Sequence, residues 1–152
     1  MASRKRIQFS TIIAAPVSRV FELMTEPQTY KQWASAFMEG SCFEGSWQQG
    51  QRIRFLGPGG DGMVAEIAEN RRNEFISIRH LGFIAKGVED TTSEAVRAWT
   101  GAYENYTFVT TPEGTKLTVD QDVAAEFESY MVEAWPKALA KLKALCEERP
   151  AK

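Results

Sequence analysis

The segment from Ile12 to Phe21 constrains the fold most strongly, because a strand pattern ends in it and a helix pattern begins. The residues before it alternate with the period of a half-buried strand, as Ile7, Phe9, Thr11 and Ile13. Pro16 ends this strand and fits the first turn of a helix. The residues after it have the spacing of a helix with one apolar face, which consists of Val17, Val20, Phe21 and Met24. We therefore expect a sheet with a helical cover and an apolar interior between them.

The next part of the chain predicts a second short helix and then several antiparallel strands. Glu26-Pro27 ends the first helix, and Tyr30, Trp33 and Phe37 form a second amphipathic segment. Glycine-bounded runs with strand composition follow at 39–47, 52–56, 62–69 and 74–81. Two further strands are expected at 98–110 and 115–123. The glycine-rich segment 57–62 indicates a hairpin tip, because neither the Lys-Ser/Thr pair nor the helix of a nucleotide-binding loop follows it.

Residues 82–97 and 125–147 lack the glycine-bounded strand pattern of the segments before them. Residues 82–97 have no sustained period and several polar turn residues, so we expect a long connection that borders the entrance to the interior, together with the 57–62 tip. Residues 125–147 predict the longest helix, whose apolar stripe consists of Phe127, Met131, Ala134, Trp135, Ala138, Leu142 and Leu145. Because an antiparallel sheet cannot bury one face alone, this helix is expected to cover it.

Composition narrows the class of protein. The 152 residues fit a single domain spanning 1–152, and 43% apolar residues suffice for a core. A net charge of −2 argues against nucleic-acid binding, which needs a basic surface. There is neither an apolar run long enough to span a membrane nor an apolar signal core near the N-terminus. Cys42 and Cys146 lie far apart, without CxxC spacing, so we expect a cytoplasmic protein without a metal site.

The order of these motifs resembles a known superfamily over nearly the whole chain. The residues that carry the resemblance are Ile13-Ala14-Ala15-Pro16 with Val20-Phe21, Thr25-Glu26-Pro27 with Trp33, Gly40-Ser41 with Trp47-x-x-Gly50, Gly114-Thr115-x-Leu117-Thr118, and Trp135-x-x-x-Leu139-x-x-Leu142-Lys143. These motifs and their order resemble those of the SRPBCC, or START-like, superfamily, in the branch related to the activator of the heat-shock-protein ATPase.

The resemblance implies an α+β helix-grip fold. In it, a curved antiparallel sheet of about six or seven strands wraps around the long C-terminal helix, with two short helices after the first strand. In that superfamily the cavity between sheet and helix holds lipids, sterols, plant hormones, polyketides or other hydrophobic molecules. Some members are enzymes, and the co-chaperone relatives bind a protein, so the fold alone does not determine the function.

His80 is the only histidine, and it is a candidate site residue. It follows Ile76 and Ile78 with period 2, which predicts that its side chain points toward the interior with theirs. An inward histidine could orient a carboxyl or carbonyl group of a ligand, or act as an acid or base near neutral pH. The alternative is a structural histidine bonded to a backbone carbonyl.

The densest polar and aromatic cluster is Tyr103-Glu104-Asn105-Tyr106. Strand alternation places either Tyr103 and Asn105, or Glu104, Tyr106 and Phe108, on the inner face, and the pattern leaves both possibilities open. An inward Glu104 would need a polar partner, which His80 or Arg79 could supply. An outward Glu104 would face water on the convex side.

Large apolar side chains provide the other candidate ligand contacts: Trp33, Phe37, Phe55, Trp99, Phe127, Met131 and Trp135. Each is a core candidate first, but as a set they suit a pocket for an apolar molecule. Strand arginines Arg52, Arg54 and Arg79 either hold a ligand anion or face solvent.

From these patterns and the resemblance we expect a bacterial-type helix-grip protein that binds a small hydrophobic molecule, such as a lipid, without a cofactor, as a monomer or homodimer. The alternatives are a co-chaperone-like interaction module and a cyclase- or hydrolase-type enzyme that uses His80. No serine lies in a GxSxG context, so the sequence assigns no catalytic residue.

Overall fold

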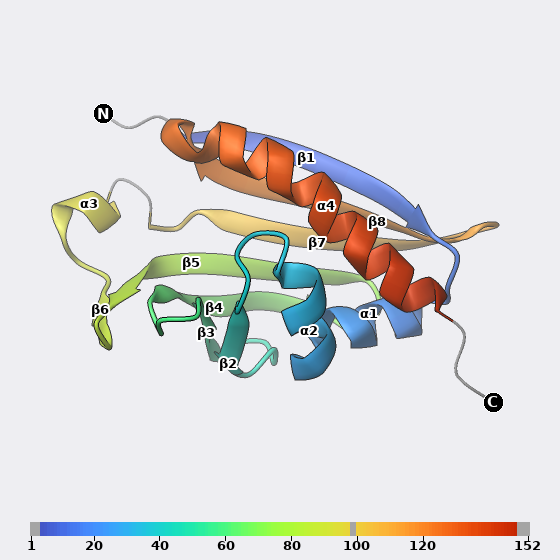
Figure 1. Cartoon of the computed structure of the whole chain (residues 1–152), viewed down its shortest axis with the longest axis horizontal. Helices are drawn as coiled ribbons and strands as arrows, with labels where there is room; N and C mark the ends of the chain where they lie inside the picture. Colours follow the sequence, from blue (N-terminus) through green and yellow to red (C-terminus); the bar gives the residue numbers. More distant parts are fainter. Residues whose placement is uncertain (1–3, 98–99, 149–152) are drawn as a thin grey trace.

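The computed structural model describes residues 4–97 and 100–148, whose elements alternate between one antiparallel sheet and the helices that cover it (Figure 1). In chain order they are β1 (Arg4–Ile13), α1 (Val17–Thr25), α2 (Pro27–Ala34), β2 (Cys42–Gly45), β3 (Arg52–Leu56), β4 (Gly62–Arg71), β5 (Phe75–Ala85), β6 (Val88–Asp90), α3 (Glu94–Arg97), β7 (Tyr103–Thr111), β8 (Gly114–Ala124) and α4 (Glu128–Glu147), which follows the short 3-10 turn η1 (Ala125–Phe127). The described residues therefore confirm the α+β helix-grip fold that the sequence predicts.

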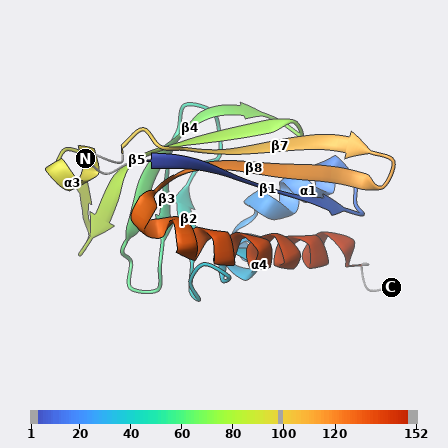
Figure 2. The ribbon, with the colours of Figure 1, turned by 90° about the horizontal axis from the view of Figure 1, so that it is seen from above.

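The sheet order is β1-β8-β7-β5-β4-β3-β2, and β6 pairs with β5. Figure 2 shows α4 along one face of this sheet, with α1 and α2 on the same side. The apolar stripe of α4 packs here through Ala134, Trp135, Ala138, Leu139 and Leu142, all of which are buried. Val20, Phe21 and Met24 of α1 are buried as well, so both helices use the faces that the sequence predicts.

The prediction of a long connection at 82–97 is wrong. Strand β5 continues to Ala85, β6 pairs with its end, and α3 follows, so the residues that the structure describes form a sheet of eight strands, where about six or seven were expected. Gly82 allows this pairing, because a Cβ atom there would lie 1.9 Å from the carbonyl oxygen of Asp90. The start of α3 is stabilised by Asp90, whose Oδ1 accepts the backbone N–H of Ser93 at 3.0 Å.

A β-bulge in β5 determines which side chains reach the helical side of the sheet. His80 pairs with Ala65 and Gly82 pairs with Val64, so Leu81 is an extra residue. Such a residue shifts the alternation of side chains by one position. As a result, His80 and Phe83 line the same pocket although they are three positions apart, an odd number.

None of the helices in the described part of the chain combines the length and the apolar character that a transmembrane helix needs.

Candidate functional site

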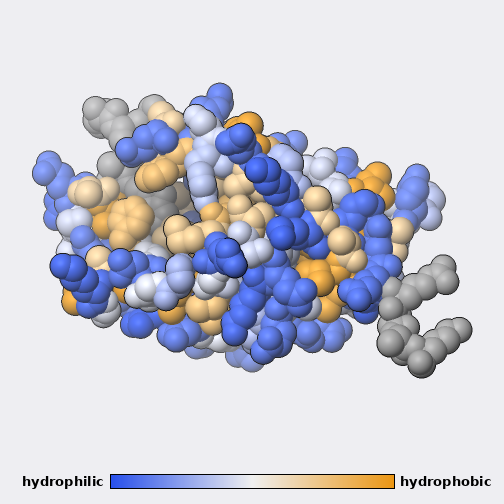
Figure 3. All heavy atoms as spheres, viewed as in Figure 1, coloured by the Kyte–Doolittle hydropathy of each residue, from blue (hydrophilic) through white to orange (hydrophobic). Residues whose placement is uncertain are grey.

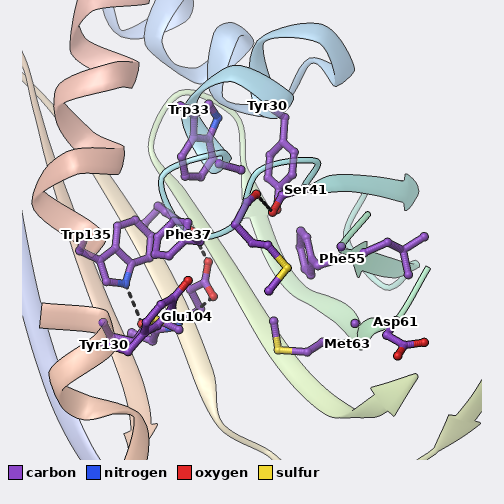
Figure 4. Close-up of a pocket in the computed structure, with 18 residues that line it drawn as sticks. Tyr30, Trp33, Phe37, Ser41, Phe55, Asp61, Met63, Glu104, Tyr130 and Trp135 are labelled. Carbon is purple, nitrogen blue, oxygen red and sulfur yellow. Dashed lines mark hydrogen bonds between the residues drawn. The ribbon is translucent and has the colours of Figure 1, made fainter. Parts of the chain in front are cut away.

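Two adjacent pockets lie where the first turns of α4 separate from the sheet. The main pocket has a volume of about 240 Å³ and lies between α2, α4 and the β3–β4 hairpin (Figure 4). The side pocket has a volume of about 230 Å³ and lies between η1, the start of α4 and strands β5 and β8. Their linings share Met63, Gln121, Tyr130 and Met131, so these four side chains form the wall between the two pockets.

The structure brings the sequence-predicted residues together in these pockets. The main pocket is lined by seven of them: Trp33, Phe37, Phe55, Glu104, Tyr106, Met131 and Trp135. His80 and Phe127 line the side pocket, which Met131 also borders. Trp99 lies outside the described residues. The 57–62 tip borders the main pocket through Gly57, Asp61 and Gly62, and the backbone N–H of Lys86 donates to Asp61 at 3.0 Å.

Glu104 is the polar centre of the site. Strand β7 turns Glu104, Tyr106 and Phe108 inward, which settles the two alternatives that the sequence left open. The carboxylate Oε1 lies 3.1 Å from Nε2 of His80 and accepts the side-chain N–H of Gln121 at 3.3 Å. The hydroxyl of Tyr106 donates to Oε2. Glu104 is only 14% exposed, so these donors replace much of the water that a carboxylate would otherwise bind.

Gln121 connects this carboxylate to α4. Its Oε1 accepts the indole N–H of Trp135 at 2.7 Å, while its amide nitrogen donates to Glu104. Glu104 and Gln121 are directly opposite each other on β7 and β8, so their side chains lie on one face of the sheet. The network therefore joins three strands and the long helix at the wall of the main pocket.

His80 lies inward, as its period with Ile76 and Ile78 predicts, and is 3% exposed. Its ring also lies 6.2 Å from that of Phe55, between ring centres. Arg79 points away from Glu104 and pairs with Glu66 at 3.0 Å, so of the two partners considered for Glu104 the structure selects His80.

The electrostatics of the main pocket are negative. Burial raises the pKa of the Tyr106 hydroxyl, and the neighbouring charge of Glu104 raises it further. The same two causes, in the same order, raise the pKa of Tyr30. The described lining contains Glu104 and Asp61 but neither lysine nor arginine. Arg52 and Arg54 face outward and pair with Glu89, at 3.6 and 2.7 Å.

The lining also contains polar residues that were not identified as site candidates from the sequence, among them Tyr30, Gln121 and Tyr130. Gln121 had a usable signal, because it continues the inward series Leu117, Val119 and Val123 on β8. Tyr130 lies three residues after Phe127 on α4 and fits the same helical stripe.

The first turn of α4 is more exposed than its predicted apolar stripe implies. Phe127 is 48% exposed and Tyr130 is 47% exposed, although both line a pocket. Met38, on the opposite side of the main pocket, is 56% exposed. On the face seen in Figure 3, apolar surface lies among charged side chains in the region between α4 and β5. These exposed apolar side chains border the openings of the pockets.

The residues that the structure describes contain no group of three or more His, Cys, Asp or Glu side chains that could hold a metal ion.

Comparisons with known proteins agree with this architecture. A structure from Mesorhizobium loti matches with a TM-score of 0.74 at 16% identity, covering 97% of this chain and all of that one. A structure from Rhizobium leguminosarum matches with a TM-score of 0.74 at 16% identity and covers 98% of each chain. The solution structure of the Aha1 dimer from Colwellia psychrerythraea matches with a TM-score of 0.73 at 17% identity, covering 94% of this chain and 96% of that one.

At these identities the likeness concerns the fold. No curated protein matches the sequence. The family model described as "Activator of Hsp90 ATPase homolog 1-like protein" matches residues 14–147, which is most of the chain. This chain therefore belongs to the family of activator of Hsp90 ATPase homolog 1-like proteins.

Proposed function

We propose that this protein binds a small hydrophobic molecule, such as a lipid or an aromatic compound, in the main pocket. The family and the fold support a ligand-binding or interaction module in general. The observation that carries the more specific proposal is the pocket of about 240 Å³ between α4 and the sheet, bordered by buried aromatic rings.

Binding draws on two features of the lining. Trp33, Phe37 and Trp135 lie against one another, with ring centres 4.8 Å apart for Phe37 and Trp135, and they offer an apolar wall. Each Å² of apolar surface that a ligand buries there stabilises the complex by about 25 cal/mol before the cost of association. The polar network around Glu104 gives the ligand an orientation.

The test uses N-phenylnaphthylamine, an apolar dye whose fluorescence rises when it leaves water. We expect the full chain to increase its emission with a saturable dependence on concentration. Met131→Trp fills space shared by both pockets and is expected to weaken binding at least about tenfold. Val132→Trp is the matched control, because the neighbouring side chain is 46% exposed and lines neither pocket.

Two results contradict the proposal. One is a dye that does not bind the wild-type chain, together with fatty acids and aromatic compounds that leave its melting temperature unchanged. The other is equal binding by both tryptophan variants, which would place the dye elsewhere on the surface.

A second candidate function is a co-chaperone-like interaction with an Hsp90-class ATPase. The family description supports it, as do Phe127, Tyr130 and Val132, which expose apolar surface on η1 and α4. The chain is expected to raise the ATPase rate of such a chaperone, and Val132→Glu is expected to abolish the rise without affecting dye binding. An ATPase rate that the wild-type chain leaves unchanged would rule this candidate out.

The location and the assembly are further parts of the proposal. Cys42 and Cys146 are both free, which supports a reducing compartment such as the cytoplasm. The Colwellia psychrerythraea protein is described as a dimer, which supports a homodimer as well as a monomer for this chain. Sedimentation velocity over a range of concentrations distinguishes these two states.

A further inference from the structure

The main pocket combines an inward carboxylate with aromatic rings. Glu104 is the acid, only 14% exposed, and Tyr30, Trp33, Phe37, Phe55 and Trp135 surround the space beside it (Figure 4). Aromatic faces attract cations, and a carboxylate of low exposure does so more strongly than one in water. The described lining of the main pocket holds no lysine, arginine or histidine, and His80 contacts Glu104 from the side pocket.

The carboxylate keeps capacity for one more hydrogen bond. An ionised carboxylate offers about four acceptor positions on its two oxygens. Within the described part of the chain, Oε1 faces His80 and Gln121, whereas Oε2 accepts only the Tyr106 hydroxyl. His80 lines the side pocket and not the main one, so Glu104 is the carboxylate of this network that the main pocket presents to a ligand.

An anionic ligand fits this site poorly. It would lose its hydration in a pocket whose charged groups, Glu104 and Asp61, are both acids. A neutral apolar ligand would leave the remaining acceptor position of Glu104 without a donor, which costs free energy in a site with little water. A ligand with an N–H donor and a positive charge satisfies both requirements.

We infer that the ligand of the main pocket is an amphiphilic amine, with an aromatic or alicyclic body between the rings and a protonated nitrogen that donates a hydrogen bond to Glu104. This inference rests on the proposed function, since it specifies the chemistry of a molecule in the same pocket. It also gives Glu104 the role of selecting the charge of the ligand.

The experiment compares three probes that share one bicyclic body and differ in charge. They are naphthylmethylammonium, naphthalenemethanol and naphthoate, each titrated into the full chain by calorimetry. We expect the ammonium probe to bind at least about tenfold more tightly than the alcohol, because a charge-assisted hydrogen bond replaces a neutral one. Naphthoate is expected to bind most weakly of the three.

Two variants test whether Glu104 causes the preference for the ammonium probe. Glu104→Gln keeps the shape of the side chain and is expected to remove the advantage of the ammonium probe while the alcohol still binds. Glu44→Gln makes the same change in charge at an exposed position outside the pockets and is expected to retain the full advantage. If Glu104→Gln does not fold, the three probes on the wild-type chain still decide the question.

The outcomes separate this inference from the proposed function. Equal affinities of the ammonium and alcohol probes for the wild-type chain would overturn the inference and leave the hydrophobic pocket in place. An ammonium advantage that persists in Glu104→Gln would also overturn it. Failure of all three probes to bind would count against the proposed function itself.

Discussion

Nε2 of His80 lies 3.1 Å from Oε1 of Glu104, although the two residues belong to different strands and are 24 positions apart in the sequence. The register between β5 and β7 produces this contact, because it pairs Ile78 with Glu104 and so places His80, two positions further along β5, on the same face. The same carboxylate is also connected to α4, because Gln121 donates to Glu104 and accepts the indole N–H of Trp135.

The first prediction concerns Gln121, which satisfies two buried polar groups at once. Gln121→Leu removes the acceptor of the Trp135 indole N–H and a donor to Glu104. Because both partners stay in place with little access to water, we expect the free energy of unfolding to fall by about 1–3 kcal/mol. Urea denaturation followed by tryptophan fluorescence measures this change.

Gln8→Leu provides the control for that prediction. Gln8 lies on β1 and donates to Asp120 at 2.7 Å, but it is exposed, so water replaces the lost partner. We expect a change within about 0.5 kcal/mol. Equal losses for Gln8→Leu and Gln121→Leu would show that the buried network adds nothing to stability.

The second prediction concerns Arg19 of α1, whose side chain caps the C-terminal end of α4. Its guanidinium donates to the backbone carbonyls of Cys146, Leu145 and Glu148 at 2.7, 3.3 and 3.0 Å. The last carbonyls of a helix have no partner within it and carry partial negative charge. We expect Arg19→Ala to lower the free energy of unfolding by about 1–2 kcal/mol, again measured with urea.

Arg19→Lys tests whether the shape of the guanidinium matters as well as its charge. Lysine retains the charge but lacks the planar set of donors that contacts several carbonyls at once. We therefore expect a smaller loss than for alanine. Arg72→Ala, at an exposed position in the turn between β4 and β5, is the control and is expected to leave stability unchanged.

The third prediction concerns Tyr30 and Tyr106 at high pH. Burial and the charge of Glu104 raise the pKa of both hydroxyls above the ordinary value of 10.0. A raised pKa in the folded state contributes stability that is fully present below the pKa of the unfolded chain and is lost as the pH rises above it. Stability should therefore fall with increasing pH from about 10 upward.

Tyrosinate absorbance in an alkaline titration measures this effect. Tyr30 and Tyr106 are expected to ionise only together with the loss of folded structure seen by circular dichroism. The double variant Tyr30→Phe and Tyr106→Phe should lack that late component. Complete ionisation of all tyrosines while the chain remains folded would contradict the prediction.

The sequence predicts the elements whose apolar pattern is long and regular. Strand β1, helix α1 and the C-terminal half of α4 each bury the face that their period indicates. Strand β6 was missed because it has three residues and follows β5 after a two-residue turn, too short a stretch for a period to emerge.

The pocket could be predicted in composition but not in geometry. Alternation alone did not decide whether Glu104 or Asn105 points toward the interior, because both faces of β7 carry an aromatic side chain. That choice depends on the register with β8, which places Glu104 opposite Gln121. The shared lining of His80 and Phe83 depends on the Leu81 bulge, for which Gly82 was the available signal.

The last prediction concerns the reactivity of the two thiols. Cys146 on α4 is 2% exposed, and burial raises the pKa of its thiol to about 11, whereas Cys42 on β2 is half-buried. The thiolate is the reactive form, so both low access and a raised pKa protect Cys146 at neutral pH. We expect iodoacetamide to modify Cys42 first, with Cys146 protected until urea unfolds the chain, as followed by mass spectrometry.

Raising the pH tests the cause of this protection. Below the ordinary thiol pKa of 9.0, Cys146 is protonated in both the folded and the unfolded chain. Between that value and about 11, the unfolded chain releases the proton and the folded chain retains it, so stability falls as the pH rises. Cys146→Ala should reduce the slope of the stability profile in this interval, leaving the contribution of the two tyrosines from about pH 10 upward, whereas Cys42→Ala should leave the full slope in place. Equal labelling rates for the two native cysteines would show that the end of α4 opens far more readily than its packing implies.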